Sequence, residues 1–242
     1  MQNSRLAAAG AALGTLAGVV GFGGVGLAST GVVGPSAGFY GFALGGLLGL
    51  VAIVVSLLGL RATRAETGMG GRSRAWRGLL AGAAIFATML SGATAGAGRP
   101  RINDITTDPN DPPAFEYALR DPDTRDRDYS YPSGFAEQQR AAYPDLAPIV
   151  LAVPPESAFD AALQAVQALD LEVTLSDRAR GVIEARATSK LFRFVDDVAI
   201  RIRPKDGGSV VDIRSKSRLG KGDLGANADR IRAIAARLTP PS

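Results

Sequence analysis

Three long runs without a charged residue occupy most of the first 98 residues and constrain the fold more than any other feature. The runs cover residues 6–28, 38–60 and 78–98. Each is close to the about 20 apolar residues that an α-helix needs to cross the hydrocarbon layer of a bilayer. The sequence therefore predicts a transmembrane region over residues 1–98, with three spans at about these positions.

The first run has an alternative interpretation as a cleaved signal peptide, because Arg5 precedes it and it is rich in Gly and Ala. Signal peptides usually carry a shorter apolar stretch of about 7–15 residues. The interpretation as a membrane span is therefore favoured.

The distribution of arginine predicts the orientation of the spans. The loop at residues 61–77 carries five arginines and one glutamate, whereas the loop between the first two spans has no charge. Arginine-rich loops stay on the cytoplasmic side of a membrane. We therefore expect a bacterial inner-membrane protein with a cytoplasmic amino terminus and a soluble domain exported to the periplasm, or to the equivalent compartment of an organelle.

Glycines recur every four residues in the first two spans. They are Gly10, Gly14 and Gly18, followed by Gly41, Gly45 and Gly49. This spacing gives each helix a face without side chains, on which another helix can approach closely. Packing within the chain is the favoured explanation, and helix association between copies is the alternative. The spans contain no Asp, Glu, Lys, Arg or His, which disfavours a channel or transporter.

The soluble part of the chain is nearly neutral. Of 27 basic and 23 acidic residues in the whole chain, six arginines and one glutamate precede residue 99, which leaves 21 basic and 22 acidic residues after it. A basic whole-chain charge of +4 would otherwise suggest nucleic acid. Nucleic acid is therefore not an expected partner.

The chain contains neither cysteine nor histidine. Thiol catalysis, disulfides, zinc sites of Cys and His, and nucleophiles activated by His are thereby excluded. We predict no catalytic residue, metal site or cofactor. An enzyme of this composition would have to use carboxylates, Lys, Tyr, Ser, Thr or Arg.

Residues 99–148 are dense in Pro and Asp and sustain no helical or strand period for long, apart from at least one helical turn at 135–143. The segment also holds several aromatic residues, which argue against a free linker: Phe115, Tyr117, Tyr129, Tyr131 and Tyr143. We expect an extended segment that wraps the domain after it. A tether that holds the domain clear of the bilayer is the alternative.

Residues 149–242 follow the order strand, helix, four strands, helix. Ser157 and Asp223 are expected to cap the two helices, and residues 206–208 supply the turn between the last two strands. This order predicts an α+β two-layer sandwich, in which both helices pack on one face of a mainly antiparallel sheet.

Alternation along the last two strands predicts a basic outer face on this sheet. Apolar residues such as Val211 and Ile213 must face the helices, so the residues between them face away. The basic members of that outer face are Arg201, Arg203, Arg214, Lys216 and Arg218. Pairing with Asp212, Glu184 or the aspartates of residues 121–128 would make the face structural rather than ligand-binding.

Four ordered stretches of the soluble part are RPRINDITTD, QQRAAYPD, FVDDVAIRIRP and VDIRSKSRLGKGDLGANADRI. Nearly residue for residue, they resemble the signature segments of the domain of unknown function 1499 family, over about residues 99–238 and none of the spans. The family occurs in bacteria and plant plastids, often behind membrane spans, and has no established activity. The resemblance implies these characteristic positions: Asn103, Asp104, Asp145, Asp197, Arg201, Ser215, Arg218, Asp223, Asn227 and Arg230.

Two further possible sites, one for an anion and one for a metal ion, each have an argument against them. Arg218, Lys221 and Arg230 around the start of the last helix suggest an anion pocket, but Asp223 would already occupy the amide donors there. Asp196 and Asp197 are neighbours on a strand and must point to opposite faces, so they cannot readily share one metal ion.

Three hypotheses for function remain. In the first, the exported domain binds an anionic envelope component, such as a lipid headgroup or glycan. Its ligand-binding residues would be Arg201, Arg203, Arg214, Lys216, Arg218 and Arg230, with a polar site at Asn103, Asp104, Asp145, Asp197, Ser215, Asp223 and Asn227. In the second, the domain docks on another envelope protein through the outer sheet face or through the sheet edge, and an exposed apolar patch would favour this hypothesis. In the third, two carboxylates converge in a cleft for hydrolysis.

Overall fold

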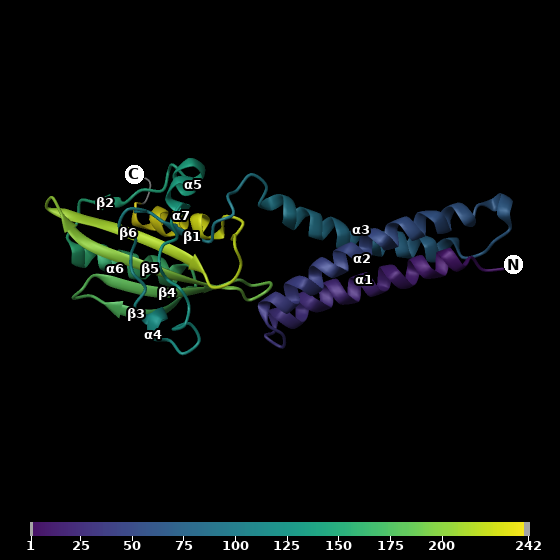
Figure 1. Cartoon of the computed structure of the whole chain (residues 1–242), viewed down its shortest axis with the longest axis horizontal. Helices are drawn as coiled ribbons and strands as arrows, with labels where there is room; N and C mark the ends of the chain where they lie inside the picture. The colour runs from purple at the N-terminus through teal and green to yellow at the C-terminus, as the bar shows by residue number, and fades with distance from the viewer. Residues whose placement is uncertain (1, 240–242) are drawn as a thin grey trace. The chain divides into compact units, whose positions relative to one another are not determined.

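The computed structural model describes residues 2–239 and divides into two compact units (Figure 1). The helical unit contains α1 (Arg5–Ser29), α2 (Pro35–Ala62), the short 3-10 helix η1 (Ala65–Thr67) and α3 (Arg72–Ala95). The C-terminal domain begins at Gly98.

The three helices α1, α2 and α3 are each long and apolar enough to cross a membrane. α3 begins at Arg72, well before the apolar run starts at residue 78, so Arg74 and Arg77 lie on its first two turns rather than in a loop. Arginine is a good helix former, which lets the helix extend beyond the apolar run. Arg72 donates to the carbonyl oxygen of Leu60 at 3.2 Å and thereby links the start of α3 to α2.

Glycine allows these helices to approach one another closely. A Cβ atom on Gly14 would lie 2.7 Å from the carbonyl oxygen of Gly78, and one on Gly45 would meet the backbone of Gly21. A Cβ atom on Gly18, in contrast, would meet nothing within 4 Å. The other glycines of the two repeats also meet a neighbouring helix of the same chain: Gly10, Gly41 and Gly49. Helix association between copies stays a prediction.

One antiparallel sheet organises the C-terminal domain, with the strand order β1-β6-β5-β4-β3 and with β2 also paired to β6. The strands are β1 (Asp104–Thr106), β2 (Ile149–Leu151), β3 (Glu172–Asp177), β4 (Val182–Thr188), β5 (Val195–Lys205) and β6 (Gly208–Ser217). The helices α6 (Pro155–Ala168) and α7 (Ala226–Leu238) pack on one face of this sheet (Figure 1). The predicted α+β sandwich behind a helical membrane region is confirmed.

The main core lies between these two helices and the sheet. Ile200, Val211 and Ile213 point into it from β5 and β6, where they meet Phe159 of α6 and Ile231 of α7. All five side chains are buried, and burying one of this size stabilises a fold by about 1.5–3 kcal/mol. The inward-facing residues are those that the alternation predicts.

The start of α6 differs from the expectation. The helix begins at Pro155, with Pro154 in the capping position, so Ser157 lies inside the helix and is not its cap. Proline is well suited to the first helical position because its φ angle is already fixed near the helical value.

Residues 99–148 are here called the covering segment. Its middle part, around Phe115 and Tyr129, lies over the sheet face opposite α6 and α7, whereas Ile102, Ile105 and Tyr143 belong to the main core. The segment contributes β1 and two short helices, α4 (Tyr117–Arg120) and α5 (Phe135–Ala142). Phe115 and Tyr129 form a small second core with Ala199 of β5, and their ring centroids are 5.0 Å apart. The covering segment therefore shields part of the outer sheet face from solvent.

The helical packing gives a testable prediction. Gly45→Val is expected to destabilise the helical unit by about 1–3 kcal/mol, as overpacking does elsewhere, because the new side chain would meet the backbone of Gly21. Gly18→Val is the matched control, since that position faces open space. Thermal unfolding of the full chain in detergent, followed by circular dichroism, measures both. Equal stability of the two variants would contradict this packing.

Candidate functional site

Four of the predicted basic residues, which lie on β5 and β6, each pair with a carboxylate of the covering segment: Arg201, Arg203, Arg214 and Lys216. Arg214 donates through Nε and Nη2 to Asp104 at 2.9 and 2.7 Å, and Nζ of Lys216 donates to the same carboxylate at 2.9 Å. The Asp104 side chain is 0% exposed and that of Arg214 is 4% exposed. Asp104 begins β1 and the two cations lie on β6, so this ion cluster fastens the covering segment to the sheet.

Arg214 also contacts the covering segment further along the chain. It donates to the carbonyl oxygens of Pro113 at 3.1 Å and Tyr129 at 2.8 Å. Its guanidinium carbon lies 4.9 Å from the ring centroid of Phe115 and 5.6 Å from that of Tyr131, within the range of cation–π attraction. Most of the donor capacity of Arg214 is therefore used inside the domain.

A second ion cluster lies nearer the β5–β6 turn. Arg201 and Arg203 donate to the buried Asp212 at 3.0 and 2.7 Å, and both also lie within 3.3 Å of Asp111 in the covering segment. The Oδ1 atom of Asp212 is buried and has no hydrogen-bond partner within residues 2–239. The two arginines thus bridge β6 and the covering segment.

Arg218 forms the third cluster, at the end of β6. It donates to Asp197 through Nε and Nη2 at 2.8 and 2.7 Å, and the hydroxyl of Tyr129 donates to the same carboxylate at 2.5 Å. Burial, together with the hydrogen bond to Asp197, raises the pKa of Tyr129, so this phenol stays neutral and acts as a donor.

On the helix side of the sheet, a polar network joins β5, β6 and α7. Arg230 donates to Asp196 at 2.7 Å and to the hydroxyl of Ser215 at 2.8 Å, and that hydroxyl donates to Asn227 at 2.6 Å. Asn227 in turn donates to the carbonyl oxygen of Asn103 at 3.3 Å. Asp196 and its neighbour Asp197 therefore do serve opposite faces of the sheet.

Asp223 occupies the start of α7. Its carboxylate accepts the backbone amides of Gly225 and Asn227, both at 2.8 Å, although Gly225 itself holds the capping position. These amides are the donors that an external anion would need at this helix terminus. An anion bound near Arg218, Lys221 and Arg230 would therefore find these two amides already bonded to Asp223.

Asp145 is placed away from the other predicted site residues. Its carboxylate accepts from Nε and Nη2 of Arg232 on α7 at 2.6 and 2.8 Å. This hydrogen bonding lowers the pKa of Asp145 below its ordinary value. The pair lies at the surface, where ion pairs contribute little to stability.

The sequence offers Glu184 on β4 as an ion-pair partner for the outer basic residues, but the structure bonds it to backbone amides instead. Its buried carboxylate accepts the backbone amides of Glu116, Tyr117 and Ala118, at 2.5, 2.8 and 3.3 Å. Burial raises the pKa of Glu184, although the three amides partly oppose this shift. The sequence places a glutamate on the outer sheet face, but no pattern around Glu184 identifies the amides of residues 116–118 as its partners.

A hollow of about 450 Å³ opens in the covering segment beside Arg214. Its lining is mainly apolar and aromatic, with two arginines and one aspartate: Pro112, Ala114, Phe115, Leu119, Arg127, Asp128, Tyr129, Ser130, Tyr131 and Arg214. Of the six basic residues predicted to bind a ligand, Arg214 lines this hollow, and Arg218 and Arg230 do not. Arg201, Arg203 and Lys216 do not line it either.

The carboxylates of the domain are largely committed to such contacts. Asp104, Asp197 and Asp223 are bonded to cations or to backbone amides, so the hydrolase hypothesis gains no support from them. Within the part of the chain that the structure describes, no group of three or more acidic side chains converges as a metal site.

Comparison with known families singles out the same part of the chain. A family model described as "Protein of unknown function (DUF1499)" matches residues 104–238. The match runs from β1 to α7 and covers more than half of the chain, and the helical unit lies outside it. No curated protein matches the chain.

The fastening role of Arg214 can be tested by substitution. Arg214→Met leaves Asp104 buried beside Lys216 alone, and removal of one partner from a buried ion pair costs about 3–5 kcal/mol. Arg237→Met is the control, because Arg237 is exposed and donates a hydrogen bond to a carbonyl oxygen of its own helix. Urea unfolding of the full chain in detergent, together with trypsin cleavage at Arg125 in the covering segment, measures both variants. Matched stability and cleavage rates would contradict this role.

Proposed function

Because the chain belongs to the DUF1499 family, whose function is unknown, we propose its function from the geometry of its own C-terminal domain. The protein is an integral membrane protein of the bacterial inner membrane. Its C-terminal domain is exported to the periplasm and binds an anionic component of the cell envelope, such as a lipid headgroup or a glycan.

The hollow in the covering segment is the observation that carries this proposal. Apolar and aromatic walls with a few converging polar groups are typical of ligand sites in proteins. Phe115, Leu119 and Tyr131 offer an apolar wall, and Arg127 brings an exposed guanidinium to it. A ligand with an apolar part and a negative group fits this combination better than a purely charged one.

The arginines of this binding hypothesis do not all have the same role. Arg201, Arg203 and Arg218 are paired with carboxylates, and Arg214 is held against Asp104 at the base of the hollow. Their role in binding is to fix the covering segment in place. The direct contact to the negative group falls to Arg127, which donates to the carbonyl oxygen of Arg218 at 2.5 Å and pairs with no carboxylate within residues 2–239.

A docking role on another envelope protein is the second candidate. Val150 of β2 is 59% exposed and Val153 just after it is 39% exposed. Exposed apolar residues on an outer strand are a common basis for pairing with another chain.

Native mass spectrometry tests the ligand proposal. The full chain is extracted in detergent from its own membrane as wild type, as Arg127→Glu and as Arg125→Glu. Arg125 is also exposed and lies outside the hollow, so its variant controls for the change in charge. We expect an anionic adduct on the wild type and the control, and its loss from Arg127→Glu. Equal adducts on all three proteins would assign them to lipid bound by the helical unit and would sink the proposal.

The orientation has its own test, which the absence of native cysteine makes simple. Ser73→Cys, in the first turn of α3, lies beside the arginines that favour the cytoplasm, and Ser157→Cys lies on the surface of the C-terminal domain. In intact bacterial cells with a permeable outer membrane, a membrane-impermeant maleimide should label Ser157→Cys and spare Ser73→Cys. The reverse pattern would refute a periplasmic domain.

A further inference from the structure

The loop between β6 and α7, residues 218–225, presents two apolar side chains to the surroundings. Leu219 is 40% exposed and Leu224 is 58% exposed. Leu224 also has a φ angle of 54°, a left-handed backbone conformation that a bulky residue rarely adopts. The loop therefore holds a leucine in an unfavourable backbone geometry without burying it in the domain, which suggests that something outside the domain covers it.

Two cations flank these leucines. Arg101 and Lys221 are exposed, and neither has an ion-pair partner among residues 2–239. The backbone of Arg101 packs on Gly222, since a Cβ atom there would lie 3.3 Å from the Cα atom of Arg101. The one carboxylate of the loop, Asp223, is already bonded to the amides of α7. The nearby carboxylate of Asp229 is paired with Arg99 and Arg232, so the unpaired charges beside the two leucines are those of Arg101 and Lys221.

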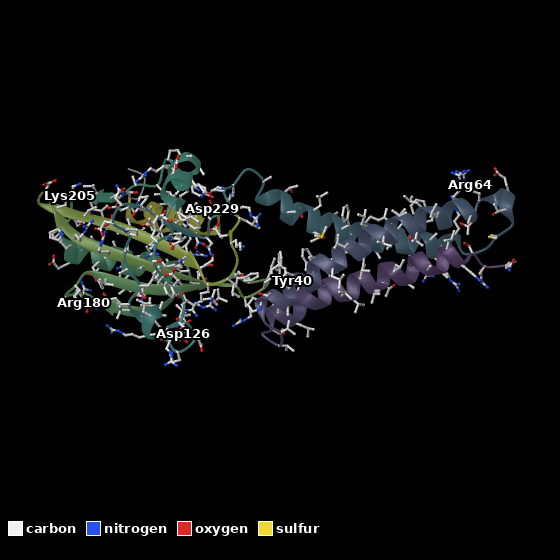
Figure 2. The ribbon with its side chains drawn as sticks, viewed as in Figure 1. Tyr40, Arg64, Asp126, Arg180, Lys205 and Asp229 are labelled. Atoms are coloured by element: carbon white, nitrogen blue, oxygen red, sulfur yellow. The ribbon has the colours of Figure 1, made fainter. Side chains whose placement is uncertain are left out.

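The loop is fastened to the first residues of the C-terminal domain. Arg99 donates to the carbonyl oxygen of Leu224 at 2.7 Å, and Asn103 donates to that of Gly220 at 2.7 Å. Asp229, labelled on α7 in Figure 2, accepts from Arg99 at 2.9 Å and fixes its side chain. These hydrogen bonds hold the β6–α7 loop next to residues 99–103.

Covalent continuity then limits how far the loop can be from a bilayer. α3 ends at Ala95, and Arg99 is four residues farther along the chain. Four residues reach at most about 14 Å even when fully extended. Since α3 is long and apolar enough to span a membrane, the loop must lie near the surface from which that helix emerges.

We propose that the β6–α7 loop rests on this membrane surface, with Leu219 and Leu224 at the boundary between headgroups and acyl chains and with Arg101 and Lys221 on anionic phospholipid headgroups. Exposed leucines flanked by basic residues are the pattern of an interfacial contact. The contact holds the C-terminal domain in one orientation on its own membrane. It is separate from the proposed ligand hollow and does not depend on it.

Site-specific fluorescence tests the contact on the full chain. A single cysteine replaces Leu224, is labelled with an environment-sensitive dye, and the protein is reconstituted into phosphatidylcholine vesicles with and without phosphatidylglycerol. Lipids brominated near the top of the acyl chain serve as quenchers. Val150→Cys is the matched control, because Val150 is 59% exposed and pairs near the opposite end of β6 from the loop.

We expect the dye at position 224 to be quenched severalfold more strongly than the dye at position 150. Adding Arg101→Gln and Lys221→Gln should reduce that quenching in vesicles with phosphatidylglycerol and leave it nearly unchanged without it. Equal quenching at positions 224 and 150, or none at 224, would overturn the proposal. Strong quenching that is unchanged by Arg101→Gln and Lys221→Gln would overturn the proposed contact of these two cations with anionic headgroups.

Discussion

The fully buried carboxylate of Asp104 is the constraint on which the C-terminal domain depends. A carboxylate without access to water is stable only when cations and hydrogen bonds replace its hydration, and Arg214 and Lys216 do this from β6. The same arginine continues to Pro113 and Tyr129. One ion cluster thus determines both where the covering segment enters the sheet and where it crosses it.

The other buried charges follow the same logic and give the sheet two covered faces. On one face, α6 and α7 bury aliphatic side chains. On the other, the covering segment supplies Asp111 to Arg201 and Arg203 and the amides of residues 116–118 to Glu184. Because both faces of the sheet are covered, a partner must bind to the covering segment, the helices, the strand edges or the loops. This is why the proposed ligand contact involves Arg127 and the proposed membrane contact involves Leu224.

The sequence predicts the parts of this structure that depend on local periodicity. Uncharged runs predict the three helices, and alternation predicts that Val211 and Ile213 face α6 and α7. Alternation also separates Arg214 from the core, but it carries no information on what lies above the outer face. The partner of Arg214, Asp104, is 110 residues away in the chain, and no local pattern connects them. β1 was missed for a related reason, since three residues are too few to display a period.

That separation along the chain also bears on how the domain is made. A ribosome releases the covering segment before it releases β6, so Asp104 emerges long before Arg214 and Lys216 exist to receive it. During that interval the segment has no sheet to cover, and its aromatic residues have no partner in Ala199. Contacts between distant parts of a chain form slowly because loop closure must precede them. The domain therefore completes its fold only when nearly the whole chain has been synthesised. A chain truncated before β6 would leave the covering segment without Arg214 and Lys216, the partners of Asp104.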